Sequence, residues 1–148
     1  MNSLITFLIG MTPVLEIRGA IPYGLSFGLS TYEAFFYGFL GNIFITLILI
    51  QYLEVVSVFL RSRFSIFEKF FTWLFSRTRR KYSKKVVNLG EIFLFLFVAV
   101  PLPITGAWTA VAISFVFGFN RKKSFLAISL GVFVAGMVVL GVFNTLLV

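Results

Sequence analysis

The sequence predicts an all-α integral membrane protein. We expect an inverted repeat of a re-entrant helical hairpin followed by a transmembrane helix, with a cytoplasmic interfacial amphipathic helix in addition. Three observations lead to this fold class: 59% of the residues are hydrophobic, apolar segments recur along the whole chain, and two of those segments are broken by prolines. Soluble domains are only about 45–50% apolar. A chain with 21 phenylalanines and 12% charged residues therefore needs lipid as its solvent.

Residue usage excludes several classes of function. The chain has no cysteine and no histidine, and its five acids are scattered glutamates. Disulfides, thiol chemistry and histidine-based metal sites are excluded, and we expect no metal and no cofactor. No arrangement of a nucleophile and a base is present, so we do not expect an enzyme. The net charge of +8 lies mainly in 61–85 and 121–123. Such basic loops beside spans mark the cytoplasmic side of a membrane, an explanation that we prefer to nucleic-acid binding.

The single membrane domain, 1–148, contains four apolar regions: 4–28, 34–60, 92–118 and 125–148. A helix needs about 20 residues to cross a hydrocarbon core of about 30 Å. The second and fourth regions have no proline and are predicted to be full spans. The first and third are broken near their middles, because proline lacks an amide hydrogen and bars the turn around it. The breaking residues are Pro13, Gly19, Pro22 and Gly24 in the first region and Pro101, Pro103 and Gly106 in the third.

Charge then suggests the topology. The basic segment 61–90 should be cytoplasmic, and so should residues 121–123. Region 92–118 lies between them, so a single crossing would place 121–123 outside. A re-entrant hairpin that turns at "PLPITG" returns the chain to the cytoplasm. The alternative is a plain protein of four full spans.

The two halves resemble each other. "FGLSTYEAFFYGFLG" (27–41) aligns with "FGFNRKKSFLAISLG" (117–131) at an offset of 90, and each stretch follows a broken apolar region. The linking turn is acidic in one half and basic in the other, which is typical of an inverted-topology repeat. We therefore predict that 4–28 is a second re-entrant hairpin, that repeat one is 4–60 and that repeat two is 92–148.

Residues 64–76, "FSIFEKFFTWLFS", have polar positions at helical spacing. They predict an amphipathic helix in the cytoplasmic interface, although a simple topology anchor is an equal alternative. The following basic run would bind anionic lipid headgroups, at about 1 kcal/mol per basic residue. The predicted headgroup contacts are Arg77, Arg79, Arg80, Lys81, Lys84 and Lys85.

Glu16 and Arg18 are ionisable residues inside a broken apolar region. A lone charge at the bilayer centre costs about 2.5–3.5 kcal/mol on insertion scales, so such residues are candidates for function. Glu16 would bind a proton or a cation, and the planar fork of Arg18 would bind a phosphate or carboxylate. Alternatively, the two side chains neutralise one another and pin the hairpin. In the second broken region, Thr105 offers a hydroxyl, and Trp108 is more often a packing residue.

The spans themselves contain few polar residues. Asn42 and Thr46 share a helix face, as do Gln51 and Glu54. Asn42 and Gln51 are expected to join helices, and Glu54 is expected near the cytoplasmic headgroups. Since only two full spans surround the site, we also expect a homo-oligomer.

Two motifs, "EIRGAIP" (16–22) and "PLPITGAW" (101–108), resemble those of the "putative small multidrug export protein" family of prokaryotes. This family is thought to be a distant relative of the DedA/SNARE-associated (VTT) superfamily. The resemblance implies two facing re-entrant segments, a multi-pass location in the cytoplasmic (inner) membrane, and lipid movement between leaflets or proton-dependent transport. DedA proteins carry essential arginines in the second half, whereas this second motif has none. The residues that the resemblance marks as the site are Glu16, Arg18, Gly19, Pro22, Pro101, Pro103, Thr105, Gly106 and Trp108.

The leading hypothesis is a small transporter or lipid translocase of DedA-like type. It would move an anionic lipid headgroup or a small solute through a midplane site between the two re-entrant segments, with proton coupling at Glu16. One alternative is an exporter of cationic drugs, with Glu16 as the counter-ion. Another is a non-transporting membrane scaffold that uses the basic loop on anionic lipid. Membrane lipids, preferentially anionic, are the expected partners.

Overall fold

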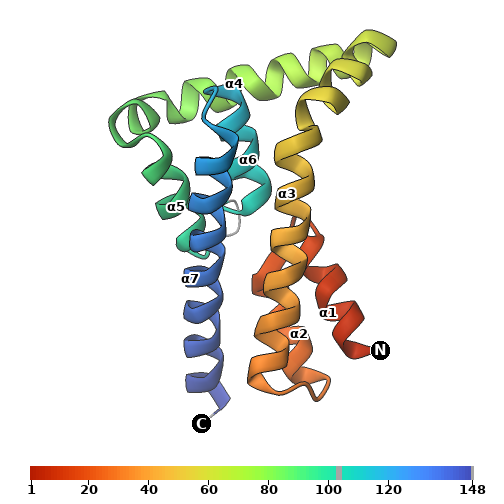
Figure 1. The fold of residues 1–148 in the computed structure, drawn as a ribbon, viewed down its shortest axis with the longest axis vertical. Coiled ribbons are helices and arrows are strands. Elements are labelled where there is room, and N and C mark those ends of the chain that lie inside the picture. The colour runs from red at the N-terminus through yellow and green to blue at the C-terminus, as the bar shows by residue number, and fades with distance from the viewer. Residues whose placement is uncertain (103–104, 148) are drawn as a thin grey trace.

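The computed structural model describes residues 1–102 and 105–147. Over these residues the chain forms seven helices and no strand, which confirms an all-helical fold (Figure 1). The helices are α1 (Asn2–Met11), α2 (Glu16–Ser26), α3 (Thr31–Arg63), α4 (Ser65–Leu89), α5 (Glu91–Ala99), α6 (Ala107–Val116) and α7 (Arg121–Leu147).

The two long helices, α3 and α7, coincide with the two predicted full spans. They have 33 and 27 residues, so at 1.5 Å per residue they are about 50 and 40 Å long. Both are long and apolar enough to cross a membrane, and only 12% and 28% of the residues in their most apolar stretches are buried. A core helix of a soluble protein would bury that surface. The chain is therefore a membrane protein with two candidate spanning helices, and Val148, the predicted end of the second, lies outside the described residues.

The four short helices form two pairs, one in each broken apolar region. α1 packs against α2 and α3, while α5 packs against α6 and α7. In Figure 1 each pair turns back near the middle of the molecule. We call the two connections the first break (residues 12–15) and the second break (residues 100–102 and 105–106 of the described chain). Pro13 and Pro101 lie at these breaks because proline cannot supply the amide that would continue the helix.

α4 lies across one end of the molecule, and both termini lie at the other end (Figure 1). It is one helix of 25 residues, so the predicted amphipathic segment 64–76 and the basic run after it form a single element. No proline or glycine interrupts it before Gly90. α4 is joined to the end of α6: Arg79 Nη2 donates to the Val116 carbonyl at 3.3 Å, and the rings of Phe75 and Phe115 are 5.2 Å apart. The basic helix and residues 121–123 therefore share one end of the molecule.

The turn between α2 and α3 and the turn between α6 and α7 have the same hydrogen bonding, 90 residues apart. Each contains a glycine with positive φ, Gly28 at 87° and Gly118 at 67°, where other residues would be strained. In each turn an amide also donates to a carbonyl five residues earlier, at 2.9 and 3.0 Å; the donor and acceptor are Leu29 and Gly24, then Phe119 and Ser114. α3 and α7 begin at residues 31 and 121. The sequence match between the halves thus has a structural counterpart.

Small residues bring the helices of the first half into close contact. A Cβ atom on Gly41 would run into the carbonyl of Phe7 on α1, and one on Gly38 would lie 3.0 Å from the Cβ of Ala20 on α2. Gly24 and Ala34 pack in the same way further along, at 2.9 Å. α2 and α3 run in opposite directions (Figure 1). The contacts of Gly38 with Ala20 and of Gly24 with Ala34 therefore fix which residues of the two helices lie opposite each other.

Candidate binding site between the two helix breaks

Glu16 begins α2 directly after the first break and is only 3% exposed. Its backbone φ is +50°, a left-handed conformation that costs a residue other than glycine about 1–3 kcal/mol. The carboxylate lies at the N-terminus of α6, where Oε1 accepts a long hydrogen bond from the backbone amide of Trp108 at 3.4 Å. The free amides and the dipole at a helix N-terminus favour a negative charge. Glu16 therefore caps a helix of the other half of the molecule.

Gly106 makes room for this carboxylate. A Cβ atom built on Gly106 would overlap both carboxylate oxygens of Glu16. Any side chain at position 106 would thus displace the carboxylate from the end of α6. The glycine of the second motif is required by a side chain of the first.

Arg18 reaches across to the second break. Its Nη1 donates to the carbonyl of Leu102, and its Nη2 donates to the carbonyl of Thr105. These carbonyls lie beyond the end of α5 and are outside any helix, so they need partners. The Nε atom of Arg18 is buried and has no hydrogen-bond partner. Among the described residues the ion pair is Glu54–Arg121; Glu16 and Arg18 do not pair directly but both bind the second break.

Thr105 and Trp108 complete the contact between the breaks. The hydroxyl of Thr105 donates to the Val100 carbonyl at 2.6 Å and accepts from the Leu102 amide at 3.1 Å, which fixes the shape of the second break. The indole Nε1 of Trp108 donates to the carbonyl of Met11, at the end of α1, at 3.1 Å. Hydrogen bonds therefore run in both directions between the two breaks.

The structure brings five of the marked residues together: Glu16, Arg18, Thr105, Gly106 and Trp108. Pro22 and Pro101 lie beside them and line one cavity with Arg18. Gly19 lies apart from this contact and faces Leu15, whose Cβ would be 2.6 Å from a Cβ at position 19. Pro103 lies outside the described residues.

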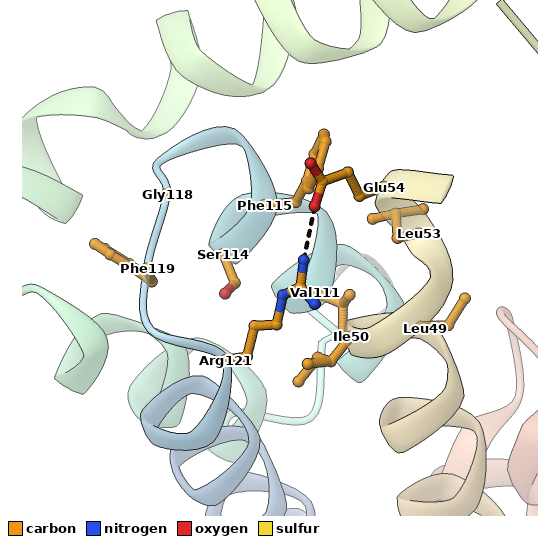
Figure 2. A pocket seen from close by; sticks show the side chains of 10 residues that line it. All are labelled: Leu49, Ile50, Leu53, Glu54, Val111, Ser114, Phe115, Gly118, Phe119 and Arg121. Carbon is orange, nitrogen blue, oxygen red and sulfur yellow. Dashed lines mark hydrogen bonds and ion pairs between the residues drawn. The ribbon is translucent and has the colours of Figure 1, made fainter. Parts of the chain in front are cut away.

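Two cavities approach the contact from opposite ends of the molecule. The first, of about 360 Å³, lies toward the termini; it is lined by Arg18, Pro22, Pro101, Val138, Val139, Val142 and Phe143. The second, of about 280 Å³, lies toward α4 (Figure 2). It is lined by Leu49, Ile50, Leu53, Glu54, Val111, Ser114, Phe115, Gly118, Phe119 and Arg121. The floor of the second cavity, at Val111, is about one helical turn from Trp108. Residues of the contact thus lie near both cavities: Arg18 lines the first, and Trp108 is about one turn from Val111 of the second.

Asn42 is a buried polar residue that the sequence did not mark as part of the site. It is fully buried, and neither atom of its amide group has a hydrogen-bond partner, so it does not join helices through its side chain as expected. It follows Gly38 by one turn on α3, and the antiparallel register with α2 places it level with Glu16. A buried polar group without a partner needs an explanation such as a water or ligand. Asn42 is therefore a further candidate for the site.

The geometry defines a class: a small helical membrane protein in which two broken helix pairs meet around a buried carboxylate and a guanidinium. The chain belongs to the family described as "Putative small multi-drug export protein", whose model matches residues 16–138. The match begins at Glu16 and includes both motifs, α3, α4 and most of α7. No curated protein and no solved structure matches the chain. Membership of this family is consistent with a small membrane transporter.

Proposed function

We propose that the protein is a small secondary transporter or lipid translocase of DedA-like type. It moves an anionic lipid headgroup or a small anionic solute through the contact between the two helix breaks, and Glu16 exchanges a proton. One observation carries the proposal: a buried carboxylate and a guanidinium bind the second break between two cavities at opposite ends of the molecule.

The proposal includes two re-entrant hairpins. The short helices have 9 to 11 residues, so each is about 14–17 Å long, half of a hydrocarbon core of about 30 Å. Each pair would enter the bilayer to its middle and return. The positive-inside rule then places α4 and residues 121–123 in the cytoplasm and the termini outside. The matching turns 90 residues apart and the opposite directions of α3 and α7 (Figure 1) support an inverted repeat.

In the proposed mechanism, a substrate anion competes with groups of the protein itself. Arg18 binds two neutral carbonyls, whereas a phosphate offers charged acceptors that form stronger hydrogen bonds. The carboxylate of Glu16 occupies the N-terminus of α6, which is a favourable place for an anion. Protonation of Glu16 removes that negative charge and frees the amides for the substrate. Proton and anion binding are therefore coupled, because the charged carboxylate and the anion exclude each other.

A second candidate function, export of cationic drugs, is favoured by a different cavity. It has about 910 Å³ and lies between the first turns of α3 and the second half of α7. Aromatic side chains line it, and Glu33 stands among them; the aromatic residues are Tyr32, Phe35, Phe36, Tyr37 and Phe133. Aromatic faces and a carboxylate together attract organic cations.

The proposal is tested by reconstituting the full chain in lipid vesicles and measuring translocation of an anionic headgroup. We expect Arg18→Ala to reduce translocation to background and Glu16→Gln to abolish its dependence on a proton gradient. Arg63→Ala and Glu68→Gln are the charge-matched controls, because both residues are exposed. Rates that are unchanged in both site variants contradict the proposal. Cation transport that is lost in Glu33→Gln but kept in Arg18→Ala supports the drug exporter instead.

A further inference from the structure

The cavity in Figure 2 has an ion pair at its mouth. Arg121 Nη2 lies 2.6 Å from Glu54 Oε2, and the two side chains are 60% and 56% exposed. Ion pairs this exposed contribute little to stability. The pair is therefore easily separated. It links Arg121 of α7 to Glu54 of α3 across the opening of the cavity.

The mouth of this cavity is basic. Lys122 and Lys123 follow Arg121, and Arg79 of α4 is held at the end of α6 by its bond to Val116. Glu54 is the single acid among the described residues that line the cavity. Positive charges thus outnumber Glu54 around the mouth, and an excess of one sign of charge concentrates ions of the opposite sign. This mouth therefore attracts anions, and Glu54 occupies the guanidinium that an anion would bind.

The lining of the cavity combines apolar side chains with polar groups, among them the hydroxyl of Ser114. Leu49, Ile50, Leu53, Val111 and Phe115 form the walls. Ser114 spends its hydroxyl on a hydrogen bond to Ser124 at 2.7 Å. The only strong anion-binding group of the lining is thus Arg121, at the mouth.

We propose that this cavity is the entrance, on the α4 side, for a phosphate-bearing substrate, and that Arg121 is the first residue to bind its phosphate. Glu54 holds Arg121 while the cavity is empty. The incoming phosphate takes the place of the Glu54 carboxylate on the guanidinium, which can bind it bidentately. From there the floor at Val111 leads to Trp108 and Glu16. The direction of this path rests on the proposed function, whereas anion binding at Arg121 does not.

The experiment uses the absence of cysteine from the chain. Ser114→Cys introduces a single thiol inside the cavity, and its labelling by an anionic and by a cationic methanethiosulfonate reagent is followed in the full chain in detergent. We expect the anionic reagent to react faster by about threefold to tenfold and inorganic phosphate to slow it. Leu53→Cys, which is half-buried in the same lining, provides a second reporter. Equal rates for the two reagents and no protection by phosphate, at both positions, overturn the inference.

Two further variants test the role assigned to the ion pair. Glu54→Gln should lower the phosphate concentration needed for protection, because Arg121 is then free, and Arg121→Gln should abolish protection. Glu68→Gln and Lys69→Gln make the same charge changes on α4, away from this cavity, and should leave protection unchanged. Protection that survives Arg121→Gln overturns the inference.

The source of the phosphate is distinguished with lipid. Protection by nanodiscs that contain phosphatidylglycerol, but not by phosphatidylcholine nanodiscs or free phosphate, assigns the cavity to a lipid headgroup. Protection by free phosphate assigns it to a soluble anion, and protection by neither overturns the inference. Labelling requires no transport. If phosphate and lipid give no protection but transport still depends on Arg18, the proposed function stands and this inference is wrong. If protection is seen but transport does not depend on Arg18, the proposed function is wrong and this inference stands.

Discussion

The two helix breaks lie at similar places in the two halves but differ in length and in chemistry. At the offset of 90, Glu16 corresponds to Gly106 and Arg18 to Trp108. Arg18 and Trp108 make reciprocal contacts: Arg18 donates to two carbonyls of the second break, and Trp108 donates to the carbonyl of Met11, directly before the first break. Glu16 instead lies against the residue that corresponds to it, Gly106.

The difference between the two breaks explains why the charged side chains, Glu16 and Arg18, lie in the first half only. The first break supplies a carboxylate and a guanidinium, and the second supplies backbone groups and the space of a missing side chain. A second carboxylate at position 106 would place two like charges in contact. Glu16 can be charged at this contact because the residue opposite it, Gly106, makes room for the carboxylate.

The largest expected effect comes from removing that space. Gly106→Ala places a Cβ where the carboxylate of Glu16 lies, so the buried charge loses its place at the end of α6. We expect a loss of about 3 kcal/mol in the free energy of unfolding and loss of transport. Denaturant titration in detergent measures the first quantity. Gly141→Ala is the matched control, since its Cβ would meet nothing within 4 Å; an equal loss in both variants contradicts the account of Gly106.

Thr105→Val tests the geometry of the uncharged break. The substitution keeps the shape of the side chain but removes the hydroxyl that bonds the Val100 carbonyl and the Leu102 amide. We expect a loss of about 1 kcal/mol, because the hydroxyl's bonds are lost while the Leu102 amide and the Val100 carbonyl keep their bond to each other. Weaker binding of Arg18 to the displaced carbonyls should lower transport as well. Thr105→Ser restores the hydroxyl and should restore both; a serine variant as impaired as the valine variant assigns the effect to the lost methyl group.

Trp108→Phe removes one of the two reciprocal contacts. The ring remains, and only the indole donor to Met11 is lost. The expected cost is about 1 kcal/mol, the usual net value of one hydrogen bond. The melting temperature in detergent reports it, with Trp73→Phe on the exposed face of α4 as the control. A tryptophan at 108 that serves only for packing would show no difference from the control.

The smallest expected effect has the opposite sign. At the offset of 90, Asn42 corresponds to Val132, which is buried and apolar, so Asn42→Val makes the halves alike. The substitution removes a buried amide without a partner, and we expect the protein to become more stable by about 1 kcal/mol while transport weakens. A stability measurement and a transport assay on the same sample check both parts. A destabilised variant would show that the amide has a partner.

Much of the fold could be predicted from the sequence, because local chemistry determines it. Prolines at 13 and 101 set the breaks, long apolar runs set α3 and α7, and Gly90 ends α4. The partners in the site could not be predicted in the same way. Arg18 binds main-chain carbonyls. Every residue has a carbonyl, so no sequence motif indicates which ones Arg18 would bind. Glu54 and Arg121 form an ion pair although they are 67 positions apart in the chain. The pair depends on how α3 and α7 pack, which the sequence pattern does not reveal.

The distance of about 90 residues between the two breaks has a consequence for biosynthesis. Ribosomes add about 5–20 residues per second, so the first break leaves the ribosome about 5–20 s before the second. During that interval Glu16 and Arg18 lack the amides and carbonyls that bind them in the finished protein. The nascent first half therefore waits in or beside the insertion machinery with two unsatisfied charges, and the arrival of the second break completes its insertion.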